Sequence, residues 1–388
     1  NQANRLLEEK MQTQTTPLLA ERRPLRQLLL SRLLDNAVAE TVIEQPVMSF
    51  YLQDINALWS LKDLRARVVD VVDETHDAKT FVLRPNWRWS GFKAGQNVGV
   101  NAEINGVTQR RRYSMSCCDS QAGTFQITVK RVVDGRVSNW LHDNVKPGDV
   151  LDLAPPAGDF ILPHELPEKL LMLGGGSGIT PLMSQIKTLL AQDYAGDIVL
   201  MYFVRSPADR IFGAELDQLE AEHPNLRVQW CFEDDGQGGK PERFSARQLG
   251  KRVPDYRERA AFLCGPPGFM AAVREYWEKQ GLNEQLAFEY FGAPPVAVDD
   301  GKGVKAEVSL ARKDRSLIAK PNQNLLEAME AAGESPVYGC RMGICHECKC
   351  RKTSGAVRNV LTGEVTSGEE DIQICISVAA SSDVTLDY

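Results

Sequence analysis

Four cysteines near the C-terminus constrain this chain more than any other feature of its 388 residues. They are Cys340, Cys345, Cys348 and Cys375, and the first three form a C-x4-C-x2-C pattern. This spacing lets a short loop bring three thiolates to one [2Fe–2S] cluster, while a distant fourth thiolate completes the set. Gly343 suits such a loop, because a residue without a side chain lets the backbone approach the cluster closely. We therefore expect these four cysteines to bind a [2Fe–2S] cluster, which carries one electron at a time.

Two other roles for these cysteines are less consistent with the sequence. A zinc site could use Cys345, Cys348 and Cys350, or His346, but zinc sites favour paired C-x2-C units and the sequence has no second pair. A disulfide framework fits poorly, because the chain is long and its nine cysteines are an odd number. Reduced, metal-bound cysteines favour the cytoplasm as the compartment.

Charge and hydropathy limit the partners of this chain. The formal net charge of −7 argues against a nucleic-acid partner. No apolar run reaches the roughly 18–20 residues that a membrane-spanning helix needs. Residues 1–60 are expected to form a helical extension, because Leu25, Leu28, Leu29 and Leu33 recur at helical spacing in a basic stretch. This helix could make peripheral contact with the inner face of a membrane, or it could pack on the next domain, and packing is the more common role of such a stripe.

The segment 61–163 has the pattern of an antiparallel β-barrel. Short strands separated by Gly- and Pro-containing turns are typical of this architecture. The expected strands are 65–72, 80–83, 97–101, 112–115 and 124–129, and the barrel is expected to end near Pro155-Pro156.

The segment 164–292 alternates strands with helices, which predicts a doubly wound parallel sheet. The expected strands are 169–173, 197–203, 226–231, 260–264 and 286–291, and the first helix is expected over 177–191. Residues 293–303 are rich in Gly, Pro and Asp and are predicted to be a linker. The cluster domain then occupies 304–388.

Two turns of the predicted parallel sheet have the composition of a nucleotide-binding site. Glycines at a strand-to-helix turn let a pyrophosphate approach the backbone at the N-terminus of a helix. The first turn contains Gly174, Gly175, Gly176, Gly178, Thr180 and Pro181; the second, after the strand 260–264, contains Cys264, Gly265 and Pro266. Because both turns follow the carboxyl ends of strands, we expect them to bind one ligand together.

The order of motifs along the chain resembles the ferredoxin–NADP reductase superfamily. The motifs are Arg111-x-Tyr113-Ser114, Gly135-x-x-Ser138, the glycine turn at 174–181, Cys264-Gly-Pro-Pro and Glu289-x-Phe291. With the C-terminal cluster domain, residues 61–388 are similar to the three-module flavin iron–sulfur oxidoreductases. The resemblance implies a flavin-binding barrel, a nicotinamide-binding α/β domain and a plant-type ferredoxin domain of β-grasp fold.

The resemblance also implies a flavin site in the barrel. Arg111 would bind a flavin phosphate, Tyr113 would pack on the isoalloxazine ring, and Ser114 would hydrogen-bond near flavin N5. The flavin pyrophosphate would be held by four further residues, Thr128, Lys130, Val137 and Ser138. The segment Gly135–Ser138 resembles the branch of the superfamily that uses FAD rather than FMN.

At the nicotinamide, the resemblance implies roles for three residues of the α/β domain. Cys264 would lie against the nicotinamide, Phe291 would cover the flavin face, and Glu289 would orient the region of Ser114 and Cys264. The plant enzymes end in tyrosine where this chain has Phe291. Ser114, Cys264 and Glu289 are therefore the expected catalytic residues.

The segment after the strand 197–203 bears on the choice of nicotinamide cofactor. A 2′-phosphate favours Arg and Ser, whereas an acidic residue at the strand end favours a free ribose. Arg205, Ser206 and Arg210 occur here, so NADPH is expected, with NADH as the alternative.

The electron acceptor is indicated only by resemblance. Residues 50–60 resemble the segment that precedes the barrel in reductases of membrane fatty-acid desaturases and hydroxylases. The expected function is therefore electron transfer from NADPH through FAD and [2Fe–2S] to such a partner. Two alternatives remain: a reductase of a soluble aromatic-ring oxygenase, and a flavin iron–sulfur redox sensor without turnover.

Overall fold

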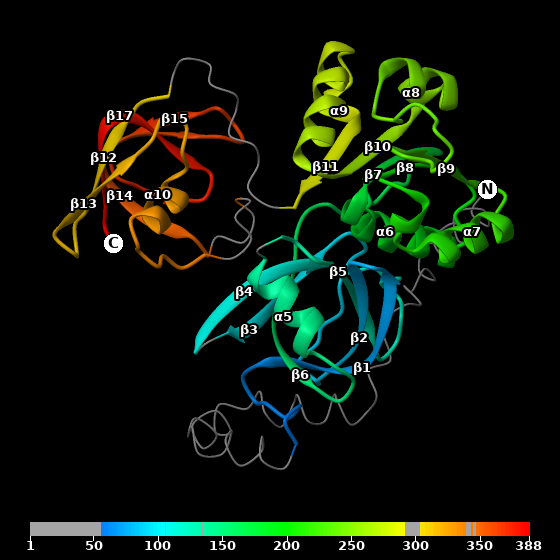
Figure 1. Cartoon of the computed structure of the whole chain (residues 1–388), viewed down its shortest axis with the longest axis horizontal. Coiled ribbons are helices and arrows are strands. Elements are labelled where there is room, and N and C mark those ends of the chain that lie inside the picture. Colours follow the sequence, from blue (N-terminus) through cyan, green and yellow to red (C-terminus); the bar gives the residue numbers. More distant parts are fainter. Residues whose placement is uncertain (1–55, 105, 134, 292–302, 339–342, 344–346) are drawn as a thin grey trace, which may run out of the picture. The chain divides into compact units, whose positions relative to one another are not determined.

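The computed structural model describes residues 56–104, 106–133, 135–291, 303–338, 343 and 347–388 (Figure 1). The chain divides into a unit of residues 1–61 and a unit of residues 62–388. In the first unit, Asn56 closes a turn by accepting hydrogen bonds from the amides of Leu58 and Trp59. The helix expected at 25–33 and nearly all of the linker expected at 293–303 fall outside the described residues. Within the described residues, no helix is long and apolar enough to cross a bilayer.

The second unit begins with a six-stranded antiparallel sheet. Its strands are β1 (Leu64–Thr75), β2 (Ala78–Pro85), β3 (Asn97–Ile104), β4 (Val107–Ser114), β5 (Phe125–Lys130) and β6 (Val150–Ala157). They are ordered β4-β3-β6-β1-β2-β5, and helix α5 (Arg136–Asn144) follows β5. The outer strands meet where Met115 pairs with Ile127, so the sheet closes on itself and the predicted barrel is confirmed. Its interior is apolar, with Phe81, Phe125 and Ile127 fully buried.

Strand β6 was not expected, because two prolines occur where the barrel was predicted to end. The strand nevertheless lies between β3 and β1 and runs through Pro155 and Pro156. The register with β3 shifts between Asn97 and Gly99, opposite this part of β6. Proline is tolerated at such an irregularity, since the missing N–H falls where the regular ladder is already interrupted.

A five-stranded parallel sheet follows. Its strands are β7 (Lys169–Gly175), β8 (Asp197–Val204), β9 (Leu226–Phe232), β10 (Ala260–Gly265) and β11 (Leu286–Tyr290), in the order β11-β10-β7-β8-β9. Helices α6 (Ile179–Ala191) and α7 (Gly213–Glu222) pack with one buried cluster, while α8 (Ala246–Arg252) and α9 (Pro267–Lys279) pack with another. Four short 3₁₀ turns complete it: η1 (Gly176–Gly178), η2 (Pro207–Asp209), η3 (Tyr256–Glu258) and η4 (Asn283–Gln285). The predicted doubly wound sheet is confirmed.

Helix α6 is bonded directly to the barrel. Ser184 Oγ donates to the carbonyl of Cys117 at 2.7 Å, and Gln185 Nε2 donates to the carbonyl of Phe160 at 2.8 Å. Both side chains are fully buried, so these bonds are shielded from water. The helix that follows the glycine turn is thereby fixed against the segment that follows Ser114.

The C-terminal part of the chain is a mixed sheet with one helix. Its elements are β12 (Ala306–Leu310), β13 (Arg315–Ala319), α10 (Leu325–Ala331), β14 (Lys349–Asn359), β15 (Val365–Ser367), β16 (Glu370–Gln373) and β17 (Ser377–Leu386). Strand β12 pairs with β13 antiparallel and with β17 parallel. Helix α10 begins at an Asn324 cap, whose Oδ1 accepts from the amide of Glu327, and its apolar face joins the core of this domain. The arrangement is the predicted β-grasp fold.

Candidate functional site

Three of the predicted motifs meet at the carboxyl edge of the parallel sheet. In the strand register, Cys264 of β10 lies between Gly174 of β7 and Glu289 of β11. The sequence separates these residues by 90 and 25 positions, so only the strand order brings them together. This edge is where open α/β sheets bind their ligands.

The two turns at this edge also pack tightly on each other. A Cβ atom added to Gly178 would lie 2.3 Å from the carbonyl oxygen of Cys264, and one added to Gly175 would lie 2.8 Å from Pro266 Cδ. Gly176, by contrast, has a φ of +50° and nothing within 4 Å of an added Cβ. The glycines therefore serve two purposes: some let the turns pack together, and Gly176 adopts a left-handed backbone with free space beside its Cα. This geometry fits a nucleotide pyrophosphate at the start of α6.

Ser114 of the barrel reaches the same edge through Glu289. Its Oγ donates to Glu289 Oε2 at 3.3 Å, while Asn97 Nδ2 donates to Glu289 Oε1 at 2.8 Å. All three side chains are buried. Glu289 thus links the antiparallel sheet to the parallel sheet, and it lies beside Cys264. The three predicted catalytic residues form one group.

Burial controls the protonation of this group. It raises the pKa of Glu289 to about 7, although hydrogen bonds from Asn97 and Ser114 and the charge of Arg112 act in the opposite direction. Burial, together with the negative charge of Glu289, also raises the pKa of Cys264 well above the usual value. Cys264 is therefore a neutral thiol at physiological pH, and Glu289 can change its charge near neutrality.

The predicted flavin residues lie on β4, β5 and α5. Arg111 and Tyr113 are on β4, and burial raises the pKa of the Tyr113 phenol, so that residue stays neutral. Val137 and Ser138 are buried in the first turn of α5, which has no side-chain cap. Uncapped amides at a helix N-terminus fit a phosphate group.

Two other predicted flavin residues already have protein partners. Lys130 Nζ forms an ion pair with Asp77 at 2.9 Å. Thr128 Oγ1 lies 2.7 Å from Thr80 Oγ1 and 2.9 Å from Ser116 Oγ, on the opposite face of the strands from the apolar core residues Phe81 and Ile127. The pairing of Lys130 with Asp77 was not expected from the sequence, because Asp77 lies in a hairpin turn with no motif of its own.

The residues predicted to select NADPH lie around η2. Arg205 is exposed at the end of β8. Ser206 Oγ donates to Asp209 Oδ2 at 2.6 Å, and the Arg210 guanidinium lies over the Trp230 ring, 4.7 Å from its centroid. Arg210 also pairs with an acid of α7, at 3.1 Å. The segment therefore contains a buried acidic side chain, Asp209, beyond the end of β8.

Two of the four predicted cluster ligands are among the described residues. Cys348 and Cys375 are buried, and their Sγ atoms lie 3.1 Å apart. A Cβ added to Gly343, whose φ is +80°, would lie 2.6 Å from Ile376 Cδ1. Gln373 Nε2 donates to the carbonyl of Gly343 at 2.6 Å. Adjacent thiols beneath a tightly packed glycine fit a loop-bound cluster; Cys340 and Cys345 lie outside the described residues.

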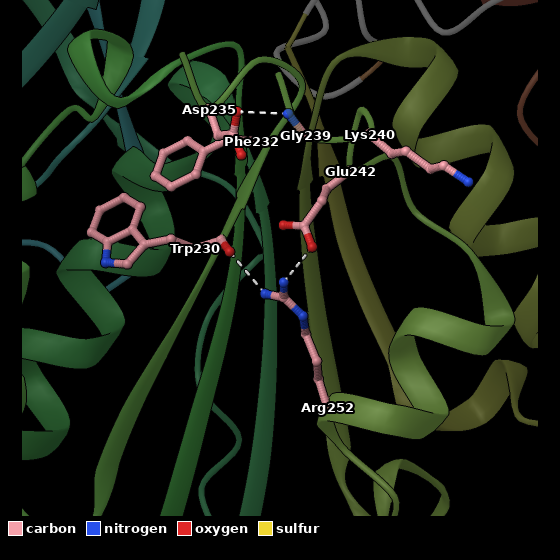
Figure 2. Close-up of a pocket in the computed structure, with 7 residues that line it drawn as sticks. All are labelled: Trp230, Phe232, Asp235, Gly239, Lys240, Glu242 and Arg252. Atoms are coloured by element: carbon pink, nitrogen blue, oxygen red, sulfur yellow. Dashed lines mark hydrogen bonds and ion pairs between the residues drawn. The ribbon is translucent and has the colours of Figure 1, made fainter. Parts of the chain in front are cut away.

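A cavity on the parallel-sheet domain lies away from this site. It measures about 520 Å³ and is found beside β9 and α8 (Figure 2). Arg252 points into it, but its guanidinium is held by Glu242 and by the carbonyl of Trp230, at 2.5 and 2.8 Å. The charge of Arg252 is therefore already satisfied by the chain, and none of the predicted site residues lines this cavity.

Comparison with protein families assigns all three domains. An oxidoreductase FAD-binding domain matches residues 65–161, an oxidoreductase NAD-binding domain matches 172–275, and a 2Fe-2S iron-sulfur cluster binding domain matches 308–380. The chain belongs to the three-module flavin/[2Fe–2S] oxidoreductases of the ferredoxin–NADP reductase superfamily. Its cofactors are FAD, NAD(P)H and a [2Fe–2S] cluster, as predicted, rather than a zinc ion.

Relatives of this oxidoreductase are similar over most of their length. An NADPH oxidoreductase of Mycobacterium tuberculosis is 36% identical over 341 residues, which are 87% of each chain. The glycine betaine monooxygenase reductase subunit of Chromohalobacter salexigens is 33% identical, over 80% of this chain and 91% of its own. Among solved structures, phthalate dioxygenase reductase is 25% identical with a TM-score of 0.57, covering 84% of this chain and 98% of the other.

Two residues of the oxidoreductase site carried no signal in the sequence. Asn97 follows an ordinary Gly-Gln pair, and Arg112 is the middle residue of the Arg111-x-Tyr113 motif, where the motif specifies nothing. They become visible only in the structure, where Arg112 donates to Asn97 and Asn97 donates to Glu289. These bonds join residues that are distant in the sequence, so no local motif includes them.

Proposed function

We propose that this chain is the NADPH-dependent reductase component of an oxygenase system. It would take electrons from NADPH and deliver them singly, from its cluster, to an acceptor oxygenase. The observation that carries this proposal is the joining of Ser114, Cys264 and Glu289 at the edge of the parallel sheet. It brings the predicted flavin residues and the predicted nicotinamide residues to one place, in a chain that ends in a cluster domain.

The residues of the chain have separable tasks in this scheme. FAD, when bound, accepts a hydride and releases its two electrons one at a time, and the cluster carries one electron. Arg111, Tyr113 and the first turn of α5 would hold the flavin. Ser114 and Glu289 would orient the reacting groups: an ionised Glu289 accepts a hydrogen bond from Ser114, whereas a protonated Glu289 can donate one. In the protonated state the Ser114 hydroxyl is available to donate to another acceptor.

NADPH is proposed over NADH because of Arg205, Ser206 and Arg210 around η2. An arginine presents several donors to a phosphate at once. The name of the mycobacterial relative, NADPH oxidoreductase, supports the same choice. The acid Asp209 in this segment counts the other way, so the preference is expected to be moderate.

For the acceptor, the relatives favour an oxygenase. They include reductase subunits named for glycine betaine monooxygenase and for stachydrine N-demethylase. A membrane fatty-acid desaturase or hydroxylase is the more specific candidate, supported by the sequence of residues 50–60 and by the basic, apolar stretch near the N-terminus. A soluble aromatic-ring oxygenase needs neither feature. A redox sensor without turnover would not need a complete nicotinamide site.

Deleting residues 1–45 separates the membrane-associated candidate from the soluble one. Binding to liposomes, and capture of the acceptor from membrane and soluble fractions, would be compared for the full chain and the deletion. Loss of liposome binding and of membrane capture supports the desaturase or hydroxylase. Unchanged behaviour, with capture from the soluble fraction, favours the soluble oxygenase.

Substitution of a cluster ligand tests the electron route. Cys348→Ser should leave NADPH-dependent reduction of ferricyanide, which flavin can reduce directly, and should abolish reduction of cytochrome c. Cys350→Ser is the matched control, because this half-buried thiol lies two residues away and is not a predicted ligand. Loss of both activities in a Cys348→Ser protein that retains flavin would contradict the sequential route. The same proteins test the sensor alternative. If NADPH does not bleach the flavin absorbance of the wild type, a redox sensor without turnover is favoured.

A further inference from the structure

Asn97 makes a bond that joins the two sheets at the site. It lies at the start of β3 and is only 3% exposed. Its Nδ2 donates to Glu289 Oε1, on β11, at 2.8 Å. A buried hydrogen bond to a carboxylate is stronger than one at the surface, because water does not compete for either partner.

Arg112 determines which end of the Asn97 amide faces Glu289. Arg112 Nε donates to Asn97 Oδ1, and Arg112 Nη2 donates to the carbonyls of Asn97 and Pro155 at 3.0 and 3.1 Å. A guanidinium has donors only, so the amide oxygen must face Arg112 and the NH₂ group must face Glu289. The asparagine cannot turn over without losing a bond at each end.

The second oxygen of Glu289 receives the hydrogen bond from Ser114. Both carboxylate oxygens are therefore held by donors from the barrel, although Glu289 belongs to the parallel sheet. In the part of the chain that the structure describes, the other titratable and charged groups that face Glu289 are the Cys264 thiol of β10 and the Arg112 guanidinium of β4.

We propose that Asn97, oriented by Arg112, is a positioning residue that holds Glu289 against Ser114 for hydride transfer between nicotinamide and flavin. This inference rests on the proposed function of the Ser114, Cys264 and Glu289 group. Asn97 acts through Glu289 rather than on a ligand. It should therefore affect the rate and the pH dependence of flavin reduction, and leave the affinity for the nucleotide unchanged.

The direction of the pH effect follows from the bonds. Burial raises the pKa of Glu289 to about 7, and the hydrogen bond from Asn97 favours the ionised form. Removing that donor leaves the carboxylate less stable, so the pKa rises further. Asn97→Ala should shift the titration of Glu289 upward by about one pH unit, the effect of losing one hydrogen bond to a charged group.

A direct titration tests this without any nucleotide. The infrared band of the buried protonated carboxyl, identified by its loss in Glu289→Gln, should titrate near 7 in the wild type and higher in Asn97→Ala. Anaerobic stopped-flow reduction of the flavin by NADPH should then show the same shift in its pH profile. At low pH, where Glu289 is protonated in both proteins, the limiting rate should fall about tenfold at an unchanged nucleotide Kd.

Asn101→Ala is the matched control. Asn101 lies on the same strand, and its Oδ1 accepts from Arg110 Nε at 2.6 Å, as Asn97 accepts from Arg112. The Asn101→Ala substitution removes the same kind of Asn–Arg pair but leaves the contacts of Glu289 unchanged. Equal shifts in the two variants, or no shift in Asn97→Ala, would overturn the proposal.

Asn97→Asp covers the case in which the alanine variant does not fold or loses its flavin. An aspartate keeps the shape of asparagine and an acceptor for Arg112, but it turns an oxygen toward Glu289. The Glu289 titration should then move up by more than in Asn97→Ala, and an unchanged titration would refute the role of Asn97. If wild-type flavin is not reduced by either nucleotide, the proposed function fails; if it is reduced and the variants match it, only the positioning role fails.

Discussion

The two ends of the proposed nicotinamide nucleotide site are built in different ways. At the hydride end, defined by Ser114, Cys264 and Glu289, every side chain is buried and the bonds connect the barrel to the parallel sheet. At the adenosine end, defined by Arg205, Ser206 and Arg210, the first residue is exposed and the other two bond to acids close in sequence.

This difference separates rate from specificity. Groups held in a water-excluded place by long-range bonds are preorganised, which is what a chemical step requires. Charges at the surface are screened by water and salt, so they contribute modestly to affinity and can distinguish one nucleotide from another. Substitutions at the hydride end should therefore change how fast the flavin is reduced, and substitutions at the adenosine end should change which nucleotide is preferred.

The largest effect is expected for Glu289→Ala. This change removes the acceptor of both the Asn97 and the Ser114 bonds, so flavin reduction by NADPH should slow about 10²-fold, in the range typical of a lost acid–base group. In the wild type the rate should fall as pH rises through about 7, because ionised Glu289 draws the Ser114 hydroxyl toward itself. Stopped-flow measurements across this range would show the decline in the wild type and its absence in the variant.

Two further variants calibrate that result. Glu289→Gln cannot ionise but can still bond to Ser114, so it should keep most of the rate and lose the pH dependence. Glu74→Ala removes another glutamate between barrel and parallel-sheet domain, whose Oε2 accepts from the amide of Phe212 at 3.3 Å. This contact is near the adenosine end, and the other carboxylate oxygen accepts from Thr80 Oγ1, next to Thr128. The rate per bound flavin should therefore be largely unchanged. A slow Glu74→Ala variant would mean that any damaged contact between these domains slows flavin reduction. The hydride end and the adenosine end would then not differ in their effect on the rate.

The next largest effect is expected for Gly178→Ala. The new methyl group would lie 2.3 Å from the backbone carbonyl of Cys264, which cannot move aside as a side chain can. The crowding should cost about 1–3 kcal/mol of stability, measured by thermal or denaturant unfolding. Gly268→Ala is the control, since nothing lies within 4 Å of its added Cβ and it is in helix α9. Equal loss in both variants would show that the turns are not in close contact.

The contrast between the two ends also explains what the sequence could predict. The glycine turn, Cys264 and Glu289 were identified because each belongs to a local motif at the end of a strand. Parallel pairing of β7, β10 and β11 then places them together, as alternation of strands and helices implies. The cluster cysteines were predicted for a similar reason, because three of the four belong to one short segment with a typical spacing.

The features of the site and the fold that the sequence did not predict depend on contacts that no local pattern encodes. Asn97 lies 192 residues from its partner Glu289, and Asp77 lies 53 residues from Lys130. Strand β6 was missed because its two prolines weigh against a strand, and only the irregular register opposite β3 makes them acceptable. These features arise when elements pack, so they follow from the tertiary structure and not from composition.

A smaller effect is expected for Arg205→Ala. If this exposed guanidinium binds the 2′-phosphate, its loss should raise the KM for NADPH about tenfold and leave that for NADH nearly unchanged, since one charge-assisted hydrogen bond is lost. Steady-state kinetics with both nucleotides give the ratio of the KM for NADPH to the KM for NADH. Arg227→Ala is the control, because this exposed arginine pairs with Asp197 at the opposite end of the same sheet. Equal changes for the two nucleotides would show that Arg205 does not distinguish them.

The smallest effect, in the opposite direction, is expected for Asp209→Asn. The carboxylate accepts the Ser206 hydroxyl at 2.6 Å, so its negative charge lies within the segment that would receive the 2′-phosphate. The asparagine can still accept that bond while the charge is gone. Asp209 is buried, but a 2′-phosphate beside the exposed Arg205 would be surrounded by water, so the repulsion is weak and kcat/KM for NADPH should rise about threefold relative to NADH. Added salt should shrink this gain, because screening weakens charge effects and leaves hydrogen-bond geometry alone. A gain that persists at high salt would mean that Asp209 acts by holding Ser206 in place, and the adenosine end would then be preorganised like the hydride end.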